Sequence, residues 1–562
     1  MSKIKIFAAA FFFIFCFALS FPFVIPGNSE PVFLHQLMGW ILIFPVLPLF
    51  FQILNCCATF KKKVLAIYLI TMQANAFVFY WIFYSLNVYG GMSVAGGILA
   101  LILMFLILGT YWLLFFVLCR FFAKRPAESG TFGALITAGE GSPLPLKPWF
   151  IAFLWTAVEF LRTFFPVDFF WAALGHSQYS NKVILQWASL GSVYIISFMI
   201  AWSSLYAYTL FFKKHDKKEG IVLAVVITLL FSYSAYKLVS FKSAVPEKEI
   251  KVALMQPAIN QYDINAKEET VFEMIDVFVD QINSFDRDTD LVVWYEAAMP
   301  LRIPIGFDNF DYVMDRYFPR AYNFPNQIVG LDMVDRIDMS FYNAAGFIQN
   351  GKIREIYKKI KLAPFGEYLP YSKVLRSLGL SILVPEFSGD FVRGTEHTVY
   401  DYGDFKAAIL ICYDGTFSEN VAGFVENGAE ILVNISNDAW FGDSSETFQH
   451  GMFYPFRAVE TGRTIVRSAN VGISEVILPD GTCENSTKFL ERTTINRKVP
   501  LYKIDTVYQK FGNWFIWLIY ITFGLFLLDR LGRTEKKKKR KKENPDAPAK
   551  LRRHEEDNLK SI

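Results

Sequence analysis

The sequence predicts a polytopic α-helical membrane protein that carries one α/β domain outside the cytoplasm. Three observations predict this class: an apolar composition, a series of long apolar runs, and one region where short β-rich runs replace them. Of 562 residues, 53% are hydrophobic, 58 are Phe and only 19% are charged. An ordinary soluble domain has about a quarter of its residues charged. The composition therefore excludes a typical soluble globule.

Eight apolar runs approach the roughly 20 residues that a helix needs to cross a bilayer. They cover 4–26, 33–54, 65–87, 92–118, 147–168, 183–212, 221–242 and 513–530. The first run follows Lys3 and Lys5, as the apolar part of a signal peptide does. Its length, and the lack of a small-x-small cleavage site before Pro26, favour an uncleaved span instead.

Basic residues in the loops orient these spans. Lysine and arginine gather in every second loop, at 3–5, 61–63, 120–125 and 213–218, whereas the loops 26–30, 87–91 and 175–182 hold a single Lys. Because positive loops face the cytoplasm, the region after the seventh span lies outside it and both termini lie inside. The basic run 536–542 then meets anionic lipid headgroups. This run accounts for much of the formal charge of +4, so we expect no nucleic-acid partner.

These patterns divide the chain into four parts. They are a seven-span bundle over 1–244, an α/β domain over 245–510, an eighth span over 511–531, and a basic, Pro-containing tail over 532–562 that we expect to be disordered. The α/β domain is long enough to form a core of its own. The sequence does not determine the oligomeric state, and a monomer is the expectation.

Nine short β-rich runs mark the α/β domain. They are IKVALMQP, LVVWYE, QIVGLDM, YNAAGFIQ, IREIYK, FKAAILIC, EILVNIS, TIVRSAN and ISEVILP. Asn350-Gly351 and Asp480-Gly481 are dipeptides typical of hairpin turns. Reactive groups in such sheets gather at the ends of strands, so those ends supply the candidate site residues.

Three of the strands end on residues that suit acyl transfer. LVVWYE ends on Glu296, IREIYKK ends on Lys359, and FKAAILIC delivers Cys412 into a Gly-containing turn. A carboxylate base, a cation and a thiol are the groups needed to form and resolve a thioester. Because most of the remaining chain is apolar, we expect the acyl donor to be a lipid.

Two of these residues, Cys412 and Lys359, also have a simpler interpretation. Cys412 is either a buried strand cysteine or a disulfide partner of Cys483 on the oxidising side of the membrane. Lys359 is one of four lysines between 352 and 361, a pattern also typical of a solvated basic face. The run LAPFGEY favours a site, because it places Glu367 in an apolar loop where its carboxylate can hold the ammonium. The cysteines outside the α/β domain show no metal-ligand spacing, so we expect no metal.

A resemblance to a known family rests on these motifs together. The segments VWYEAA, YKKIKLAPFGEYLP, ICYDGTF and NISNDAWFGDS, followed by QHGMFYPFRAVETGRTIVRSANVGIS, resemble the nitrilase superfamily and, within it, the bacterial apolipoprotein N-acyltransferases. WTAVEFLR followed by WAALGHSQ resembles the fifth span of that family. The resemblance covers essentially the whole chain. It implies eight spans in the bacterial inner membrane below a periplasmic nitrilase-like αββα sandwich.

The resemblance also implies the roles of the site residues. Glu296 would be the general base, Lys359 the stabiliser of the oxyanion, Cys412 the nucleophile and Glu367 a supporting acid. In the implied reaction, Cys412 takes an acyl chain from a phospholipid. The chain then passes to the α-amine of an S-diacylglyceryl cysteine at the N-terminus of an apolipoprotein. This chemistry needs no metal or organic cofactor.

Two motifs that contain these residues depart from the family pattern. The chain has Trp294-Tyr295-Glu296-Ala297 where the family usually has Trp-Pro-Glu followed by Thr or Ser, and Cys412-Tyr413-Asp414 where it usually has Cys-Tyr-Glu. Tyr413 and Asp414 are therefore accessory candidates. We expect Asp414, which is one methylene shorter than Glu, to bond Lys359 directly or through water.

Four further features have two interpretations each. Glu159 and Arg162 share a helical face, as a structural ion pair or as a contact for a lipid headgroup or substrate. The apolar segment 374–387 is a core helix or a lid that dips into the bilayer. Trp440 packs around the acyl chain or in the core. Arg457, Glu460, Arg463 and Arg467 fit a structural polar network better than a direct role.

Two other classes of protein compete with an acyltransferase. A membrane-tethered amidase or nitrilase would use the same three residues but release the acyl group to water, and it would need no eight-span bundle. A transporter or scaffold would explain the spans. It gives no reason for Glu296, Lys359 and Cys412 all to lie at strand ends.

Overall fold

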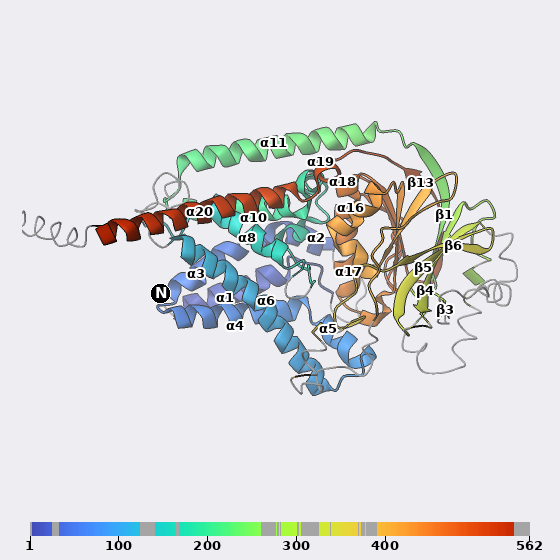
Figure 1. The fold of residues 1–562 in the computed structure, drawn as a ribbon, viewed down its shortest axis with the longest axis horizontal. Helices are drawn as coiled ribbons and strands as arrows, with labels where there is room; N and C mark the ends of the chain where they lie inside the picture. Colours follow the sequence, from blue (N-terminus) through green and yellow to red (C-terminus); the bar gives the residue numbers. More distant parts are fainter. Residues whose placement is uncertain are drawn as a thin grey trace, which may run out of the picture.

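A helical part and an α/β part lie side by side in the computed structural model (Figure 1). The structure describes residues 3–543 except 25–32, 124–140, 165–167, 260–276, 278–279, 282, 300–302, 305–324, 336, 338, 369, 372–376 and 378–390. The segment 374–387, expected to be a lid or a core helix, lies outside the described residues apart from Ser377.

Each predicted span corresponds to a helix or to a broken pair of helices. The helices are α1 (Lys3–Ala18), α2 (Phe33–Leu42), α3 (Val46–Cys56), α4 (Phe60–Val78), α5 (Trp81–Tyr84), α6 (Val94–Ala123), α8 (Pro148–Leu161), α9 (Lys182–Leu185), α10 (Ala188–Phe211), α11 (Lys217–Lys242) and α20 (Trp514–Glu543). The second run breaks between α2 and α3, where Pro45 precedes the first turn of α3.

The described helices include three that are long and apolar enough to cross a membrane: α6, α10 and α11. A fourth results if α4 and the helix after it, bent by 65°, count as one span. Apolar helices α1, α3, α8 and the first part of α20 are shorter. The sequence also predicted a disordered tail from residue 532, whereas α20 continues as a helix through the basic run to Glu543. Lys, Arg and Glu are good helix formers, and the apolar half of α20 has already nucleated the helix.

Aromatic rings fill the middle of the helical part. The rings of Trp112 and Trp155 lie 4.3 Å apart between their centroids, and Phe13, Phe50 and Phe115 surround them. On α11, by contrast, large apolar side chains such as those of Ile221, Val225 and Leu229 are exposed. This distribution suits a helix that faces lipid tails, because apolar side chains there gain nothing by being buried in protein.

Two β-sheets form the α/β part. The first has the order β13-β1-β2-β4-β5-β6, with β3 beside β4, and the second has the order β12-β11-β10-β9-β8-β7. The strands of the first sheet are β1 (Lys248–Gln256), β2 (Leu291–Val293), β3 (Ile303–Pro304), β4 (Asn326–Val334), β5 (Phe341–Gln349), β6 (Lys352–Lys358) and β13 (Thr493–Leu501). Those of the second are β7 (Val399–Asp401), β8 (Lys406–Ile411), β9 (Ile431–Ser436), β10 (Thr464–Ala469), β11 (Glu475–Ile477) and β12 (Cys483–Glu484).

All nine predicted β-rich runs contain a strand, and both predicted dipeptides lie in turns between antiparallel neighbours. The sequence missed β13, which pairs with β1 over nine residues from Lys248↔Leu501 to Gln256↔Thr493. The sequence TTINRKVPL is too polar to indicate a buried strand, because Arg497 and Lys498 occupy positions where such a strand would have apolar residues. The short strands β3, β7 and β12 were missed as well.

Successive side chains of a strand point to opposite faces, and in the first sheet both faces are packed against other parts of the protein. Val252 and Leu254 of β1 belong to the core between the two sheets, whereas Ala253 and Met255 belong to a separate cluster on the other face. Three helices of the α/β part, α16 (Ser418–Glu426), α17 (Glu446–Gly451) and α18 (Phe453–Thr461), lie between the second sheet and the helical part (Figure 1). There the Ser192 hydroxyl of α10 donates to Glu460 of α18 at 2.7 Å.

Strand directions bring the predicted site residues to one edge. β2 runs parallel to β4, and β5 is antiparallel to both β4 and β6, so β2 and β6 run the same way. Glu296 after β2 and Lys359 after β6 therefore leave the first sheet at the same edge. Cys412 follows β8 directly in the facing sheet.

Candidate active site

Glu296 lies in a tight turn three residues beyond the end of β2. Its side chain is buried, and its carboxylate accepts hydrogen bonds from the Asn437 backbone N–H at 3.0 Å and from Asn343 Nδ2 at 2.7 Å. The turn passes so close to β4 that a Cβ at Gly330 would lie 2.4 Å from the Tyr295 carbonyl oxygen. Only glycine allows this approach, so Gly330 helps to fix where Glu296 points.

Lys359 is 1% exposed, which rules out the solvated-face interpretation. Its ammonium lies 3.2 Å from Glu296 Oε1 and 2.9 Å from Glu367 Oε1. Burial alone lowers the pKa of Lys359, but the two carboxylates outweigh it and raise the pKa well above its usual value. The neighbouring lysines point elsewhere, because Lys358 lies over the Tyr342 ring at 4.2 Å and Lys361 over the Phe417 ring at 4.6 Å. A charged Lys359 therefore stands at the sheet edge.

Asn343, which the sequence gave no reason to choose, joins the two acids. It lies near the start of β5, and its Nδ2 donates to Glu296 Oε1 at 2.7 Å and to Glu367 Oε1 at 2.6 Å. The backbone carbonyl oxygen of Asn343 also accepts a hydrogen bond from the Lys359 backbone N–H at 2.9 Å. Asn343 thus fixes the base, the cation and the supporting acid relative to one another.

Glu367 is held on the loop that follows β6. Its Oε2 accepts from the Ala363 backbone N–H at 2.6 Å, and its own N–H donates to the Ala363 carbonyl at 2.9 Å. Phe365 in the same turn has a φ of 66°, in the left-handed region that few non-glycine residues adopt. The loop is therefore shaped to return the carboxylate to Lys359, as LAPFGEY predicted.

Cys412 begins a short 3₁₀ turn, η6 (Cys412–Thr416), with a φ of 47°. It is half-buried and is not bonded to Cys483, which is exposed, so the disulfide interpretation is wrong. Its side chain packs both on the core between the sheets and on the aromatic cluster of the helical part. Burial raises the pKa of the Cys412 thiol well above its usual value, and Glu296 raises it further, whereas Lys359 lowers it. The raised pKa makes the resting group at Cys412 a thiol rather than a thiolate.

Asp414 makes no direct hydrogen bond or salt bridge to Lys359 among the described residues, and the alternative of a bond through water stays a prediction. Its carboxylate accepts instead from the Tyr357 hydroxyl at 2.7 Å and from the backbone N–H groups of Lys361 at 2.7 Å and Ile411 at 3.1 Å. These three hydrogen bonds occupy the carboxylate of Asp414, whose side chain is one methylene shorter than that of Glu. Burial raises the pKa of Asp414 to about 6. Asp414 therefore ties the Cys412 turn to the loop that follows Lys359.

A chain of hydrogen-bonded polar side chains reaches the backbone of Cys412 from α17 and α18. The sequence did not predict this chain. The Tyr454 hydroxyl donates to the Cys412 carbonyl at 3.1 Å and lies 3.1 Å from His450 Nε2, while His450 Nδ1 lies 3.1 Å from Asp438 Oδ1. The Arg467 guanidinium donates to Asp438 at 2.7 Å. The sequence places only Arg467 in a structural polar network. For the other members the only available signal was position, since Asp438 follows the end of β9 as Cys412 follows that of β8.

Asp438, Glu446 and His450 also meet the spacing of a metal site, with ligand atoms within 4.8 Å of one another. Arg467 bonds Asp438 and also lies 3.3 Å from His450 Nδ1. Its positive charge lies where a cation would have to sit, and it holds the pKa of Asp438 well below its usual range despite burial. The donor set therefore fits an arginine-centred network better than a metal.

The other predicted accessory residues lie at the junction of the two parts. Tyr413 donates its hydroxyl to the Asp168 carbonyl, on a loop of the helical part. Trp440 is half-buried on the turn η7 (Asp438–Phe441), whose Phe441 ring lies 5.2 Å from that of Trp81 in α5. Arg457 pairs with Glu460 at 2.9 Å, and Arg463 donates to backbone carbonyls, as expected for a structural network.

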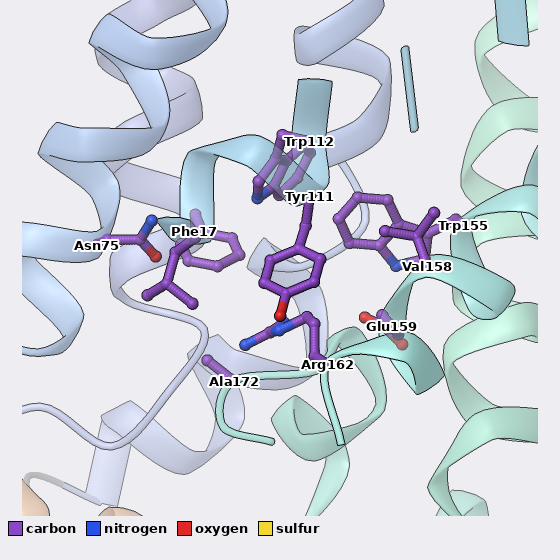
Figure 2. Close-up of a pocket in the computed structure, with 10 residues that line it drawn as sticks. Phe17, Asn75, Tyr111, Trp112, Trp155, Val158, Glu159, Arg162 and Ala172 are labelled. Carbon is purple, nitrogen blue, oxygen red and sulfur yellow. The ribbon is translucent and has the colours of Figure 1, made fainter. Parts of the chain in front are cut away.

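Glu159 and Arg162 do not form the ion pair that their spacing suggested. Within the described part of the chain no salt bridge within 4.0 Å joins them, and each is bonded to a backbone group of the loop after α8. Arg162 lies just beyond the last residue of α8, where its side chain reaches along that loop. Both residues line a small pocket together with Tyr111 and Trp155 (Figure 2).

Two family profiles match successive parts of the chain. Residues 15–206 match the profile described as apolipoprotein N-acyltransferase N-terminal domain, and residues 251–507 match that of carbon-nitrogen hydrolase. The Geobacter metallireducens apolipoprotein N-acyltransferase is 29% identical over 89% of this chain and 90% of its own length. That of Wigglesworthia glossinidia brevipalpis is 28% identical over 77% and 82%. Saccharomyces cerevisiae Nit3, a nitrilase-superfamily structure, covers 46% of this chain and 92% of its own at 19% identity and a TM-score of 0.33.

Proposed function

Because the chain belongs to the apolipoprotein N-acyltransferases, we propose that it works through a thioester on Cys412, with Glu296 as general base and Lys359 as oxyanion stabiliser. The observation that carries this proposal is the buried ammonium of Lys359, held between Glu296 and Glu367 at the sheet edge beside Cys412. Such an ammonium is a fixed positive charge in a site with little water. Charge placed in advance where an oxyanion develops is a large source of catalysis.

In the first step Glu296 takes the proton of the Cys412 thiol as sulfur attacks an ester carbonyl of a phospholipid. The tetrahedral oxyanion forms next to Lys359. As it collapses, the ester C–O bond breaks, and Glu296 returns the proton to the departing lysophospholipid oxygen. The product is an acyl thioester on Cys412. The raised pKa of this thiol suits a base that acts during attack rather than a preformed thiolate.

In the second step the α-amine of an S-diacylglyceryl cysteine at the N-terminus of an apolipoprotein attacks the thioester. Glu296 accepts a proton from the nitrogen and gives it to the Cys412 sulfur as the C–S bond breaks. The product is an N-acylated lipoprotein, and the enzyme regains its thiol. Glu367 supports both steps because its carboxylate holds Lys359 in place.

A lipid donor is favoured by where Cys412 lies. Its side chain, like that of Ala363, packs against the aromatic cluster of the helical part, so the nucleophile is at the junction with the apolar helices. We further propose that the eight apolar helical segments each cross the inner membrane. The α/β part then faces the periplasm and both termini face the cytoplasm. A water-using amidase of the same superfamily would need no such junction.

The test is the intact mass of the detergent-purified protein after incubation with phosphatidylethanolamine and no acceptor. Wild type should gain one fatty-acyl mass, Cys412→Ala should gain none, and a diacylated lipopeptide should discharge the adduct onto itself. Cys483→Ala is the matched control, because Cys483 is exposed and free and lies far along the chain. Discharge to water at the same rate with and without lipopeptide would favour the hydrolase instead.

A further inference from the structure

The segment 168–174, here called the loop 168–174, is the part of the connection after α8 that leads into the turn η3 (Leu174–Gln178), and it contacts Tyr413, the residue next to Cys412. The Tyr413 hydroxyl donates to the Asp168 carbonyl, and the rings of Tyr413 and Trp171 stack with centroids 6.3 Å apart and planes 11° apart. Trp171 Nε1 also donates to Gln449 in α17 at 3.0 Å. The position of this loop therefore bears directly on the Cys412 turn.

Two buried charged side chains of the helical part hold the loop. Glu159 Oε1 accepts from the Leu174 backbone N–H at 2.8 Å, and the Arg162 guanidinium donates to the Trp171 carbonyl. These two bonds lie on either side of Ala172, whose φ is 52°. A non-glycine residue keeps this conformation only where its surroundings enforce it. A hydrogen bond donated by a guanidinium is of the stronger, charge-assisted kind, so Arg162 suits this task.

The cavity beside Glu159 and Arg162 is too small for a lipid headgroup. It has a volume of about 10 Å³, close to the minimum that holds one water molecule. In Figure 2 the Tyr111 hydroxyl points toward Arg162, whose guanidinium lies 5.9 Å from the centroid of the Tyr111 ring. The side chains of Glu159 and Arg162 are 1% and 9% exposed. Both are enclosed by protein, which favours a role in holding the loop over a role in binding lipid.

We propose that Glu159 and Arg162 are positioning residues for acyl transfer. By fixing the loop 168–174 they hold Tyr413, and with it the Cys412 thiol, at the place where a membrane-borne ester reaches the sheet edge. The kinetic half of this inference rests on the proposed role of Cys412 as nucleophile. The structural half does not, because the loop would hold the Cys412 turn whatever reaction the thiol performs.

The structural half is tested by alkylation of the full-length protein in detergent with iodoacetamide, read at each cysteine by peptide mass spectrometry. Arg162→Leu releases the Trp171 carbonyl, and Tyr413→Phe removes the bond to Asp168 while keeping the ring. Both should raise the alkylation rate of Cys412 at least about threefold, because the loosened turn exposes the thiol. The rate at Cys483 should stay constant. Arg120→Leu, which removes an exposed arginine at the end of α6, is the matched control.

The kinetic half is tested by the rate of thioester formation at several mole fractions of phosphatidylethanolamine. In Arg162→Leu and Tyr413→Phe, kcat should fall about 10- to 100-fold with KM unchanged, because a misplaced nucleophile costs rate rather than affinity. Arg162→Lys, which keeps the charge and a donor, should restore part of kcat. The double variant should be little worse than the poorer single variant, since both changes act through one loop.

Three results would overturn the proposal. The first is a rate of Cys412 alkylation in Arg162→Leu and in Tyr413→Phe that equals the rate in the wild-type protein. Another is unchanged kcat at a lowered melting temperature, which marks a purely structural role. The third is a raised KM at unchanged kcat, which marks direct lipid contact. If wild type forms no acyl adduct at Cys412, the proposed function fails, and the alkylation rates still decide whether the loop is held by these residues.

Discussion

The two parts of the molecule bury charge in different ways. In the α/β part, the charged side chains at and behind the sheet edge are paired with one another: Lys359 with Glu296 and Glu367, and Arg467 with Asp438. In the helical part, Glu159 and Arg162 are bonded to backbone groups of a loop. The charges paired with each other lie at the sheet edge, where we propose that the chemistry takes place. The charges bonded to a backbone hold a segment in position, here the one that contacts Tyr413 beside Cys412.

Removing the central cation should show the largest effect on the α/β side. Lys359→Met should lower the rate of thioester formation about 10²- to 10³-fold, because the oxyanion loses its fixed charge. It should also lower the melting temperature, since breaking a buried ion pair costs about 3–5 kcal/mol. Lys358→Met is the control, as Lys358 lies over the Tyr342 ring. Similar rates of thioester formation in the two variants would show that Lys359 takes no part in the mechanism.

The thermal stability of the protein should depend on pH through Glu460, which lies where the two parts touch. Burial raises the pKa of this carboxyl to about 7 although Arg457 opposes the shift. The folded protein therefore holds a proton that the unfolded chain releases near pH 4.5. The resulting stabilisation, about 3 kcal/mol, is complete below about pH 4.5 and is lost as the pH rises to about 7.

The measurement for Glu460 is the melting temperature from pH 4.5 to pH 8, followed by tryptophan fluorescence in detergent. Glu460→Gln keeps the oxygen that accepts from Ser192 but cannot titrate. Wild type should lose more thermal stability than this variant as the pH rises. Parallel curves would mean that Glu460 does not carry the proton.

Asn343 should matter less than the charges that it connects. Asn343→Leu removes its two hydrogen bonds to Glu296 and Glu367 and leaves the strand intact. Bonds to charged groups are worth about 1.5–3 kcal/mol, so thioester formation should slow about 10- to 100-fold. Single-turnover kinetics with phosphatidylethanolamine give this rate. A loss of less than twofold would show that the two acids keep their places without Asn343.

Tyr454 should show the smallest effect. Tyr454→Phe removes the neutral hydrogen bond to the Cys412 carbonyl together with the hydroxyl contact to His450 Nε2, and it keeps the ring. A bond of this kind contributes about 1 kcal/mol, so kcat should fall only about fivefold. The same single-turnover assay decides, with Tyr357→Phe as a comparison that cuts the hydroxyl bond to Asp414 instead. A loss as large as that of Lys359→Met would place Tyr454 in direct contact with the reacting atoms.

Local sequence patterns predicted most of the sheet and the ends of its strands. Apolar runs closed by Glu296, Lys359 and Cys412 are visible along the chain, and their meeting at one edge follows from strand direction. Asn343 could not be found this way, because its role arises from β5 turning back beside β6. The chain from Asp438 through His450 to Tyr454 combines a strand end with two helices. Only the tertiary structure brings such distant segments together.

The pairing of β13 with β1 has a consequence for how the catalytic domain is attached. β1 begins soon after α11 ends, β13 leads through α19 (Val507–Phe511) into α20, and Glu247 bonds Leu501 across the pair at 2.9 Å. Both covalent links to the helices therefore leave from neighbouring strands, about 5 Å apart. In topological terms the domain is an insertion with adjoining ends. A short linker from Glu247 to Leu501 would therefore close the chain if the domain were removed, because these two positions are already hydrogen-bonded neighbours.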